Sequence, residues 1–241
     1  MRFLRRDTFD QAITDTVVVD YGLPPRFRDG DVVLDLGCHI GAFAIRAANR
    51  GARVVGYEAS RENYALARMN TAAFPGIEIR WAAVWRSDVD TGELQLTPSP
   101  DPVNTGGASV IFSDEASYHE FLGQPPAEPS DGTPPGRPVS HAVPTVSLDE
   151  ILRELGRVRL LKIDVEGAEL PIFLTSRELA RIDEIVGEIH EMTPAQRKLV
   201  VPGARVGELP DDRENLRNCL AASGFAVGFD SESDIFTARR G

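Results

Sequence analysis

The stretch VLDLGCHIGAFAIRAANRGARVVGYEA, residues 33–59, decides the fold of this chain. It opens with an apolar run that ends at Asp35 and Gly37, and a helical spacing of apolar residues begins after Gly41. A second apolar run ends at Glu58. Glycine lets the backbone turn sharply and approach a ligand closely, so the loop between the first run and the helix is a candidate binding site. Strand, glycine loop, helix and strand in this order predict one half of a parallel α/β sheet.

The spacing of the two glycines narrows the class of ligand. It reads D-x-G-x-x-x-G, which differs from the G-x-G-x-x-G of dinucleotide-binding proteins. Asp35 would repel a pyrophosphate, but it would attract the sulfonium and ammonium groups of S-adenosylmethionine. Glu58 lies about twenty residues further on, where an acidic side chain accepts hydrogen bonds from both hydroxyls of a ribose. We therefore expect S-adenosylmethionine as the cofactor and S-adenosylhomocysteine as the product, with the adenine beside the small residues at 82–84. The residues expected to contact the cofactor are Asp35, Gly37, Cys38, His39, Gly41, Glu58, Ala59, Ala83 and Asp164.

The rest of the chain continues the alternation of strands and helices. A short strand and a helix with a capping box, Ser147 and Glu150, lie within 143–156. The chain ends in a predicted hairpin over 226–240. We expect one domain over 1–241, with an N-terminal segment 1–30 and a proline-rich insert or lid at about 98–144, disordered over 124–138. The further strands are expected at 53–59, 77–85, 157–167 and 182–191, and the further helices at 60–74, 168–179 and 211–225.

Composition limits the partners of this chain. Its formal net charge is -11 and its pI is about 4.9, and phosphate contacts need an excess of Lys and Arg, so nucleic acid is not expected as a partner. Two cysteines cannot form a disulfide framework. No apolar stretch reaches the ~18 residues of a membrane helix, and the first residues lack a signal-peptide run. We expect a cytoplasmic protein that acts on a small molecule and does not bind a membrane; the oligomeric state stays open.

A second stretch, KIDVEGAE at residues 162–169, places carboxylates directly after a buried strand. Parallel strands present their carboxyl ends at one edge of the sheet, where ligands bind. The fold that the family resemblance of this chain implies places the strands that carry these residues side by side, so Asp164, Glu166, Glu188 and His190 are expected to lie together beside the transferred methyl group as the catalytic residues. His190 or Asp164 would act as a base or orient the acceptor. The alternatives are a divalent metal held by Asp164, Glu188 and His190, which we do not favour, and for Glu166 only a favourable charge at the next helix N-terminus.

Several blocks of this sequence resemble the FkbM family of S-adenosylmethionine-dependent methyltransferases. They are VVLDLGCHIGAFAIRAA, VVGYEAS, AAVW, VSLDEIL, LLKIDVEGAEL and IVGEIHE, and KIDVEGAE is the most specific of them. The resemblance implies an α/β, Rossmann-like class I methyltransferase fold: a mostly parallel seven-stranded sheet with helices on both faces and a C-terminal antiparallel hairpin. Two positions depart from the family, because His39 stands where Asn is usual and Glu58–Ala59 stands where Glu-Pro is usual.

The resemblance also implies an activity. The family acts mostly on hydroxyls, often of sugars and of secondary metabolites in natural product biosynthesis, and sometimes on carboxylates. The leading hypothesis is O-methylation of a small molecule, and the second is methylation of a carboxylate or an amine. A third is a protein that binds S-adenosylmethionine without transferring its methyl group, against which the intact acidic cluster argues.

Overall fold

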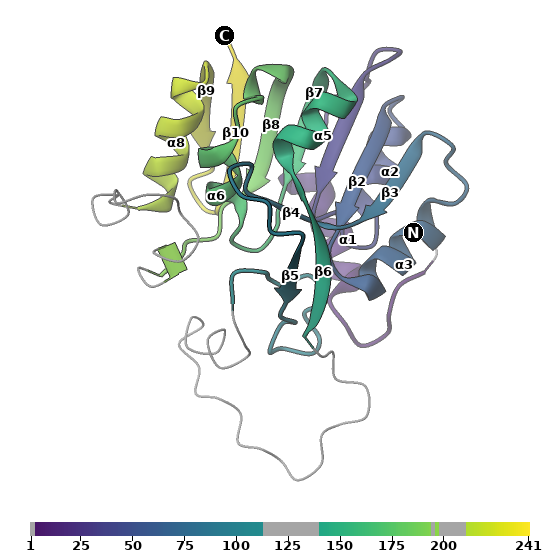
Figure 1. The fold of residues 1–241 in the computed structure, drawn as a ribbon. Helices are drawn as coiled ribbons and strands as arrows, with labels where there is room; N and C mark the ends of the chain where they lie inside the picture. The colour runs from purple at the N-terminus through teal and green to yellow at the C-terminus, as the bar shows by residue number, and fades with distance from the viewer. Residues whose placement is uncertain (1–2, 113–139, 194–195, 198–210) are drawn as a thin grey trace.

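A computed structural model describes residues 3–112, 140–193, 196–197 and 211–241. A seven-stranded sheet with the order β3-β2-β1-β7-β8-β10-β9 forms its centre (Figure 1). β10 runs antiparallel to its two neighbours, and the other pairs are parallel. This confirms the predicted sheet with its C-terminal hairpin. Its strands are β1 (Val32–Leu36), β2 (Arg53–Glu58), β3 (Ile77–Trp81), β7 (Val158–Ile163), β8 (Ile182–Glu188), β9 (Phe225–Phe229) and β10 (Ile235–Arg240).

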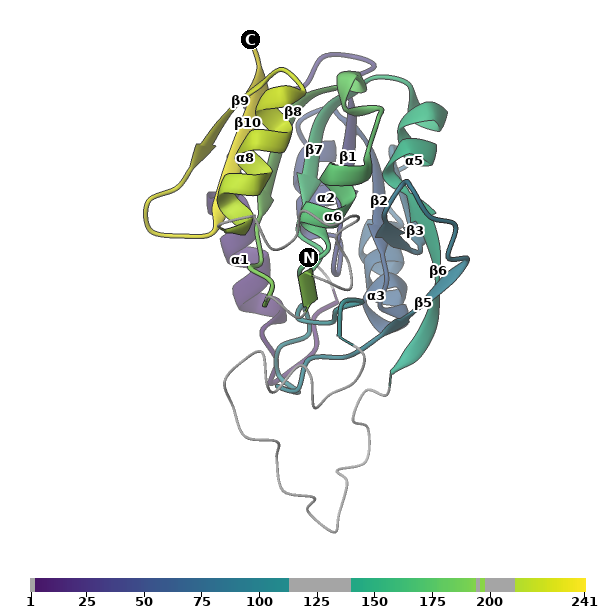
Figure 2. The same cartoon turned by 60° about the vertical axis from the view of Figure 1, so that its left-hand side comes forward.

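Helices cover both faces of this sheet (Figures 1 and 2). Successive strand residues point to opposite faces, and each face packs into its own core. One core joins Val33, Val54 and Val186 to α2 (Ala42–Ala48) and α3 (Arg61–Thr71). The other joins the neighbouring residues Leu34, Val55 and Ile185 to three further helices. These are α5 (Leu148–Leu155), α6 (Glu169–Thr175) and α8 (Asp212–Ala222).

The order of the strands reverses between β1 and β7. From β1 the chain moves outward to β2 and β3, and it then returns to form β7 on the other side of β1. Ligands of open α/β sheets bind outside the carboxyl ends of strands at such a reversal. The loop after β1 and the KIDVEGAE stretch after β7 therefore face the same crevice.

The predicted strand at 77–85 is two strands, so this prediction was wrong. The backbone N–H of Ala82 donates to the carbonyl of Glu58, the last residue of β2, over 3.1 Å. Beyond that point β2 offers no further partner, and the chain pairs instead in a second sheet with the order β4-β6-β5. The three strands are β4 (Ala83–Trp85), β5 (Glu93–Leu96) and β6 (His141–Ser147).

The short strand predicted within 143–156 is the central strand β6, which begins two residues earlier, at His141, and contains Pro144. Pro144 lies opposite Glu93 of β5, whereas the pairing with β4 starts only at Thr145. The missing N–H therefore falls where β6 has one partner. Residues 113–139 lie outside the described ranges, and with them the predicted disorder of 124–138.

Two further boundaries differ from the prediction. The helix expected over 168–179 ends at Thr175 and is followed by a short 3-10 helix, η1 (Leu179–Arg181). It ends there because the buried carboxylate of Asp149 accepts bonds from Ser176 Oγ and from the backbone N–H groups of residues 177 and 178. β8 ends at Glu188, where its pairing with β10 ends, so His190 lies beyond the strand.

The ends of two helices follow the sequence signals. Ser147 Oγ accepts from the N–H of Glu150, and the Glu150 side chain accepts from the N–H of Ser147, which confirms the predicted capping box. Ser60 caps α3 with its side chain, which accepts from the N–H of Asn63.

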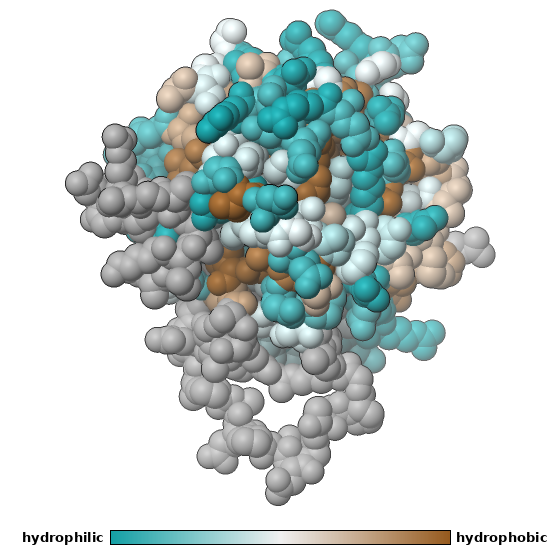
Figure 3. Space-filling view, viewed as in Figure 1, coloured by the Kyte–Doolittle hydropathy of each residue, from teal (hydrophilic) through white to brown (hydrophobic). Residues whose placement is uncertain are grey.

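An additional helix, α1 (Asp10–Asp20), lies in the N-terminal segment for which no element was predicted. On the face seen in Figure 3, hydrophilic residues predominate over α5 and apolar residues show only in small groups, as expected for a face in contact with water.

Substitution of Gly37 tests how tightly the loop after β1 is packed against the end of β7. Its φ is +71°, and a Cβ there would lie 1.8 Å from the carbonyl oxygen of Asp164. Gly30 has a similar φ of +86° with nothing within 4 Å of its Cβ position, so it is a matched control. Both alanine variants should lose roughly 1–2 kcal/mol to the left-handed backbone. Gly37→Ala should lose ~1–3 kcal/mol more from the forced separation. Urea unfolding measures this difference, and equal losses in the two variants would contradict the close approach.

Candidate functional site

The loop after β1 is fixed by both neighbouring strands. The backbone N–H groups of Gly37 and Cys38 donate to the carbonyl of Tyr57 on β2, both over 3.0 Å. From the other side, Lys162 Nζ of β7 donates to the carbonyl of Gly37 over 2.7 Å. His39 has a φ of +51° within this loop, a conformation that non-glycine residues rarely adopt. The loop is therefore a rigid turn held in one position.

A buried ion cluster lies beneath this loop. Lys162 Nζ lies 3.6 Å from Asp35 Oδ1 and 3.5 Å from Asp164 Oδ2, and Asp35 is fully buried. Burial raises the pKa of Asp35 to about 6, although Lys162 opposes that rise. Asp35, Cys38 and Gly41 support the loop from behind and do not line the pocket in front of it, whereas Gly37 and His39 do.

Glu58 ends β2 at the edge of this pocket and is 7% exposed. Its two oxygens accept from the backbone N–H groups of His39 and Ser60, each over 2.8 Å. An ionised carboxylate offers about four lone-pair sites, so both oxygens retain capacity for a ligand. Burial raises the pKa of Glu58 to about 7. The structure thus places an oriented acceptor where a ribose was predicted.

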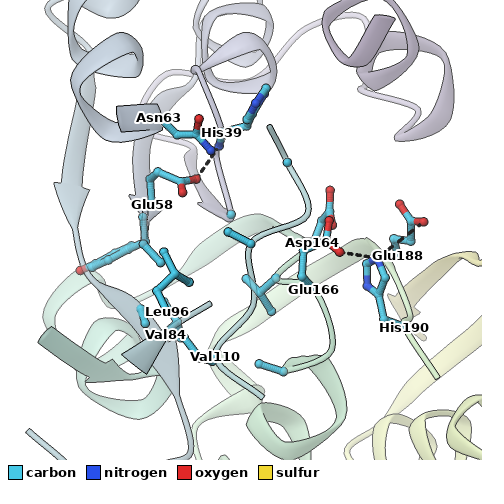
Figure 4. Close-up of a pocket in the computed structure, with 18 of the residues that line it drawn as sticks. His39, Glu58, Asn63, Val84, Leu96, Val110, Asp164, Glu166, Glu188 and His190 are labelled. Atoms are coloured by element: carbon cyan, nitrogen blue, oxygen red, sulfur yellow. Dashed lines mark hydrogen bonds and ion pairs between the residues drawn. The ribbon is translucent and has the colours of Figure 1, made fainter. Parts of the chain in front are cut away.

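The imidazole of His39 belongs to a different set of contacts. Its Nε2 lies 2.9 Å from Thr105 Oγ1 and 3.4 Å from Arg5 Nη2. Burial lowers the pKa of His39 to about 4, so the ring is neutral near pH 7. Its backbone N–H faces Glu58 (Figure 4), while its ring connects the loop to the 104–106 segment and to the N-terminal segment.

One wall of the pocket is apolar. The pocket has a volume of about 220 Å³, and in Figure 4 Val84, Leu96 and Val110 lie below Glu58, to the left of the acidic residues. Residues 82–84 line this wall, and an adenine ring beside them stays a prediction. The apolar lining residues of this wall are Ala59, Ala82, Ala83, Val84, Leu96, Ala108 and Val110.

Asp164, Glu166, Glu188 and His190 come together at the opposite end of the pocket (Figure 4). Asp164 directly follows β7, and Glu188 is the last residue of β8. His190 Nε2 lies 3.5 Å from Glu166 Oε2 and 3.8 Å from Glu188 Oε1. The structure therefore brings together the four side chains that the strand ends predicted.

Glu169 is the member of this cluster that sequence reasoning missed. It is fully buried, and its carboxylate accepts from the backbone N–H groups of Val165 and Gly167, over 2.9 and 3.1 Å. Its Oε1 also lies 3.1 Å from His190 Nδ1. The buried acid in the first turn of this helix is thus Glu169, whereas the alternative for Glu166 was a favourable charge at the same helix start. The place of Glu169 in the first turn of α6, where an acid is favourable, was the available signal.

The charges in this cluster differ from those of the free side chains. Burial opposes a charge on His190, but Glu169 and Glu166 outweigh it and hold its pKa well above the usual range, so the ring is cationic. Burial raises the pKa of Glu166 to about 8. Burial would also raise the pKa of Asp164, but Lys162, His190 and a bond from Tyr21 lower it below its ordinary value. Asp164 is therefore the ionised carboxylate of the cluster.

One group in the described part of the chain has the arrangement of a metal site. Ligand atoms of Asp164, Glu169 and His190 all lie within 4.8 Å of one another, which differs from the predicted set with Glu188. The carboxylate of Glu169 already accepts two backbone N–H groups and faces His190 Nδ1. A metal ion would also have to displace the proton of His190, because metals bind neutral imidazole. These residues fit an internally bonded cluster better than a metal ion.

Comparisons with known proteins agree with this geometry. The model of the methyltransferase FkbM domain matches residues 35–220. Together, the sheet and this match define a methyltransferase of the Rossmann-like class, an enzyme that uses S-adenosylmethionine as its methyl donor. The chain belongs to the FkbM methyltransferase family. No curated protein sequence matches it. Among the described residues, no helix has the length and apolar character that crossing a membrane requires.

Solved structures of methyltransferases are similar at low identity. The precorrin-6y C5,15-methyltransferase of Geobacter metallireducens has a TM-score of 0.45 and 13% identity, over 99% of this chain and 92% of that one. A SAM-dependent methyltransferase from Aquifex aeolicus has a TM-score of 0.39 and 14% identity, over 93% and 87%. Monomeric WbdD has a TM-score of 0.42 and 15% identity, over 86% of this chain but only 36% of that one. These values carry no information on the substrate.

The charge of Glu58 should control cofactor binding. Its pKa of about 7 means that it is largely protonated at pH 6 and ionised at pH 8. An ionised carboxylate accepts the ribose hydroxyl bonds better, so affinity for S-adenosylmethionine should fall about tenfold from pH 8 to pH 6. Glu58→Gln should bind at least about tenfold more weakly at pH 8 and lose this pH dependence. Calorimetry measures both effects, with the exposed Glu93→Gln as control. A Glu58→Gln variant with the affinity and pH dependence of the unmodified protein would remove Glu58 from the cofactor site.

Proposed function

We propose that this enzyme transfers the methyl group of S-adenosylmethionine to a hydroxyl oxygen of a small molecule, such as a sugar or a secondary metabolite. One observation carries the proposal: a single pocket joins Glu58, the expected ribose acceptor, to the carboxylates of Asp164, Glu166 and Glu188. The proposed cofactor and the proposed proton-accepting groups thus share one cavity.

The residues present fit the cofactor. Glu58 retains hydrogen-bonding capacity on both oxygens after its two backbone contacts. The small apolar residues of the apolar wall suit an adenine ring. The acidic end suits a ligand with a positive sulfonium, because opposite charges attract strongly in a partly buried site. When bound, S-adenosylmethionine supplies a methyl group that is open to attack by an oxygen nucleophile.

The acidic end also suits a hydroxyl acceptor. A hydroxyl is a weak nucleophile near neutral pH, and a positioned carboxylate that accepts its proton makes it a better one. Asp164 lines the pocket and is ionised, so it accepts a hydrogen bond from the acceptor and orients it. Glu188 borders the same space, whereas Glu166, with a pKa raised to about 8, is mostly protonated near pH 7 and offers a hydrogen-bond donor there. His190 is cationic, which suits it to hold these carboxylates together rather than to act as the base.

The alternatives are less well supported by the same residues. A carboxylate acceptor would be repelled by the ionised carboxylate of Asp164, which lines this end of the pocket. Binding without transfer leaves the convergence of four titratable side chains on one cavity without a role. An amine acceptor is compatible with the charge, and we keep it as the second candidate for that reason.

We also propose that the reaction needs no metal ion. The carboxylate of Glu169 accepts from two backbone N–H groups in the loop before α6. A metal ion would have to compete with these two groups for the carboxylate oxygens. Positioning supplies much of the acceleration of an in-line displacement, so a Lewis acid is not required for the reaction.

A panel of hydroxylated small molecules, with amine and carboxylate counterparts, tests this function through release of S-adenosylhomocysteine. Turnover is expected with hydroxyl acceptors, and it should persist in chelator. Turnover only with amines or carboxylates would replace the proposal. A complete lack of turnover, with cofactor binding intact, would favour the protein that binds without transfer.

Substitutions in the acidic cluster should separate catalysis from binding. Asp164→Asn and His190→Ala should each lower turnover about a hundredfold, because the first removes the carboxylate that orients the acceptor and the second removes the cation that holds the carboxyl groups in place. Affinity for the product S-adenosylhomocysteine should be nearly kept. Glu191→Gln is the matched control, because Glu191 is exposed beside the cluster. If both cluster variants retain full turnover in chelator, the cluster serves only structure.

A further inference from the structure

The N-terminal segment completes the pocket although it lies outside the family match. The match begins at residue 35, whereas α1 and the residues around it come earlier in the chain. Ile13, Thr16 and Tyr21 nevertheless line the same pocket as Glu58 and Asp164. The part of the chain that the family model does not cover therefore contributes directly to the site.

Tyr21 makes the most direct of these contributions. It directly follows α1, it is 5% exposed, and its hydroxyl donates to Asp164 Oδ2 over 3.0 Å. Its ring is held edge-on against Phe43 of α2, with the two centroids 6.1 Å apart. Burial and the nearby carboxylate of Asp164 raise the pKa of Tyr21, so the phenol keeps its proton and remains a donor. A rigid donor thus points at the ionised carboxylate of the cluster.

The cation of Lys162 and the hydroxyl of Tyr21 both contact the same oxygen of Asp164, Oδ2. Lys162 Nζ lies 3.5 Å from Oδ2, the oxygen that also accepts from Tyr21. The backbone of Asp164 is fixed as well, because its N–H donates to the carbonyl of Leu36 over 3.1 Å. In the described part of the chain, Oδ1 has no hydrogen-bond partner. Fixing Oδ2 from two directions sets the plane of the carboxylate and reserves Oδ1 for a ligand.

We propose that Tyr21 is a positioning residue that orients the Asp164 carboxylate toward the transferred methyl group. Without the phenol, Lys162 is the remaining partner of Oδ2, and the carboxylate turns toward that buried cation. Its negative charge then acts less on the pocket. This inference rests on the proposed place of Asp164 beside the methyl group, but it does not depend on which atom is methylated.

A pair of ligands that differ by one charge tests this role without an acceptor. S-adenosylmethionine carries a sulfonium, and S-adenosylhomocysteine carries a neutral thioether in its place. The ratio of their affinities therefore reports the negative charge that the pocket presents at the sulfur. A general loss of packing would weaken both ligands alike and leave the ratio unchanged.

Calorimetry with both ligands on the full chain gives the outcome. Tyr21→Phe should lower the affinity ratio about fivefold, with affinity for S-adenosylhomocysteine nearly kept. Asp164→Asn should lower the ratio at least as far. In the Asp164→Asn background, Tyr21→Phe should have no further effect, because the two residues act through one contact. Tyr64→Phe is the control, since it removes a phenol that contacts Arg68 on α3, away from the pocket.

An unchanged ratio in Tyr21→Phe, which includes an equal weakening of both ligands, would overturn the inference. Additive losses in the double variant would overturn it as well. An unmodified protein that binds both ligands equally would also overturn it, because Asp164 would then exert no charge effect at the sulfur. None of these results bears on the acceptor panel, so failure of this inference and failure of the proposed hydroxyl methylation are distinguishable.

Discussion

The site depends on one buried cation, Lys162. It is 2% exposed, it lies between Asp35 and Asp164, and it donates to the carbonyl of Gly37. The cation thereby joins the end of β7 to the loop after β1, across the point where the strand order reverses. Loss of one partner from a buried ion cluster typically costs about 3–5 kcal/mol, because a charge is left uncompensated. This cluster therefore determines both the position of the loop and the ionisation of Asp164.

The carboxyl groups of the site are of two kinds, which differ in whether they line the pocket. Asp35 and Glu169 are fully buried and bind protein groups, so they fix the loop after β1 and the loop before α6. Glu58, Asp164 and Glu166 line the pocket, and each is held by at least one neighbouring group. Carboxyl groups are thus concentrated at one cavity, where Lys162 and His190 keep Asp164 ionised. Such preorganised charge suits a reaction in which a cationic donor meets a neutral acceptor.

The sequence predicted the central sheet and the convergence of the acidic residues, because both depend on local periodicity and on the topology of parallel strands. Three features could not be read in this way. The division of 77–85 into two strands depends on where β2 ends as a partner, which is a long-range property. Glu169 was passed over because an acid at a helix start has an ordinary explanation. Tyr21 was missed because its contact with Asp164 joins residues 143 positions apart.

His39 is a position where both the local backbone and long-range contacts matter. A residue at a φ of +51° is more often Gly or Asn, since a short polar side chain tolerates this backbone. His39 accepts the strained conformation and places its ring against Thr105, with Arg5 and Asp10 close by. Asp10 is fully buried and itself binds Arg5 and Thr105. One substitution in the cofactor loop is thus matched by contacts from the N-terminal segment and from the 104–106 segment.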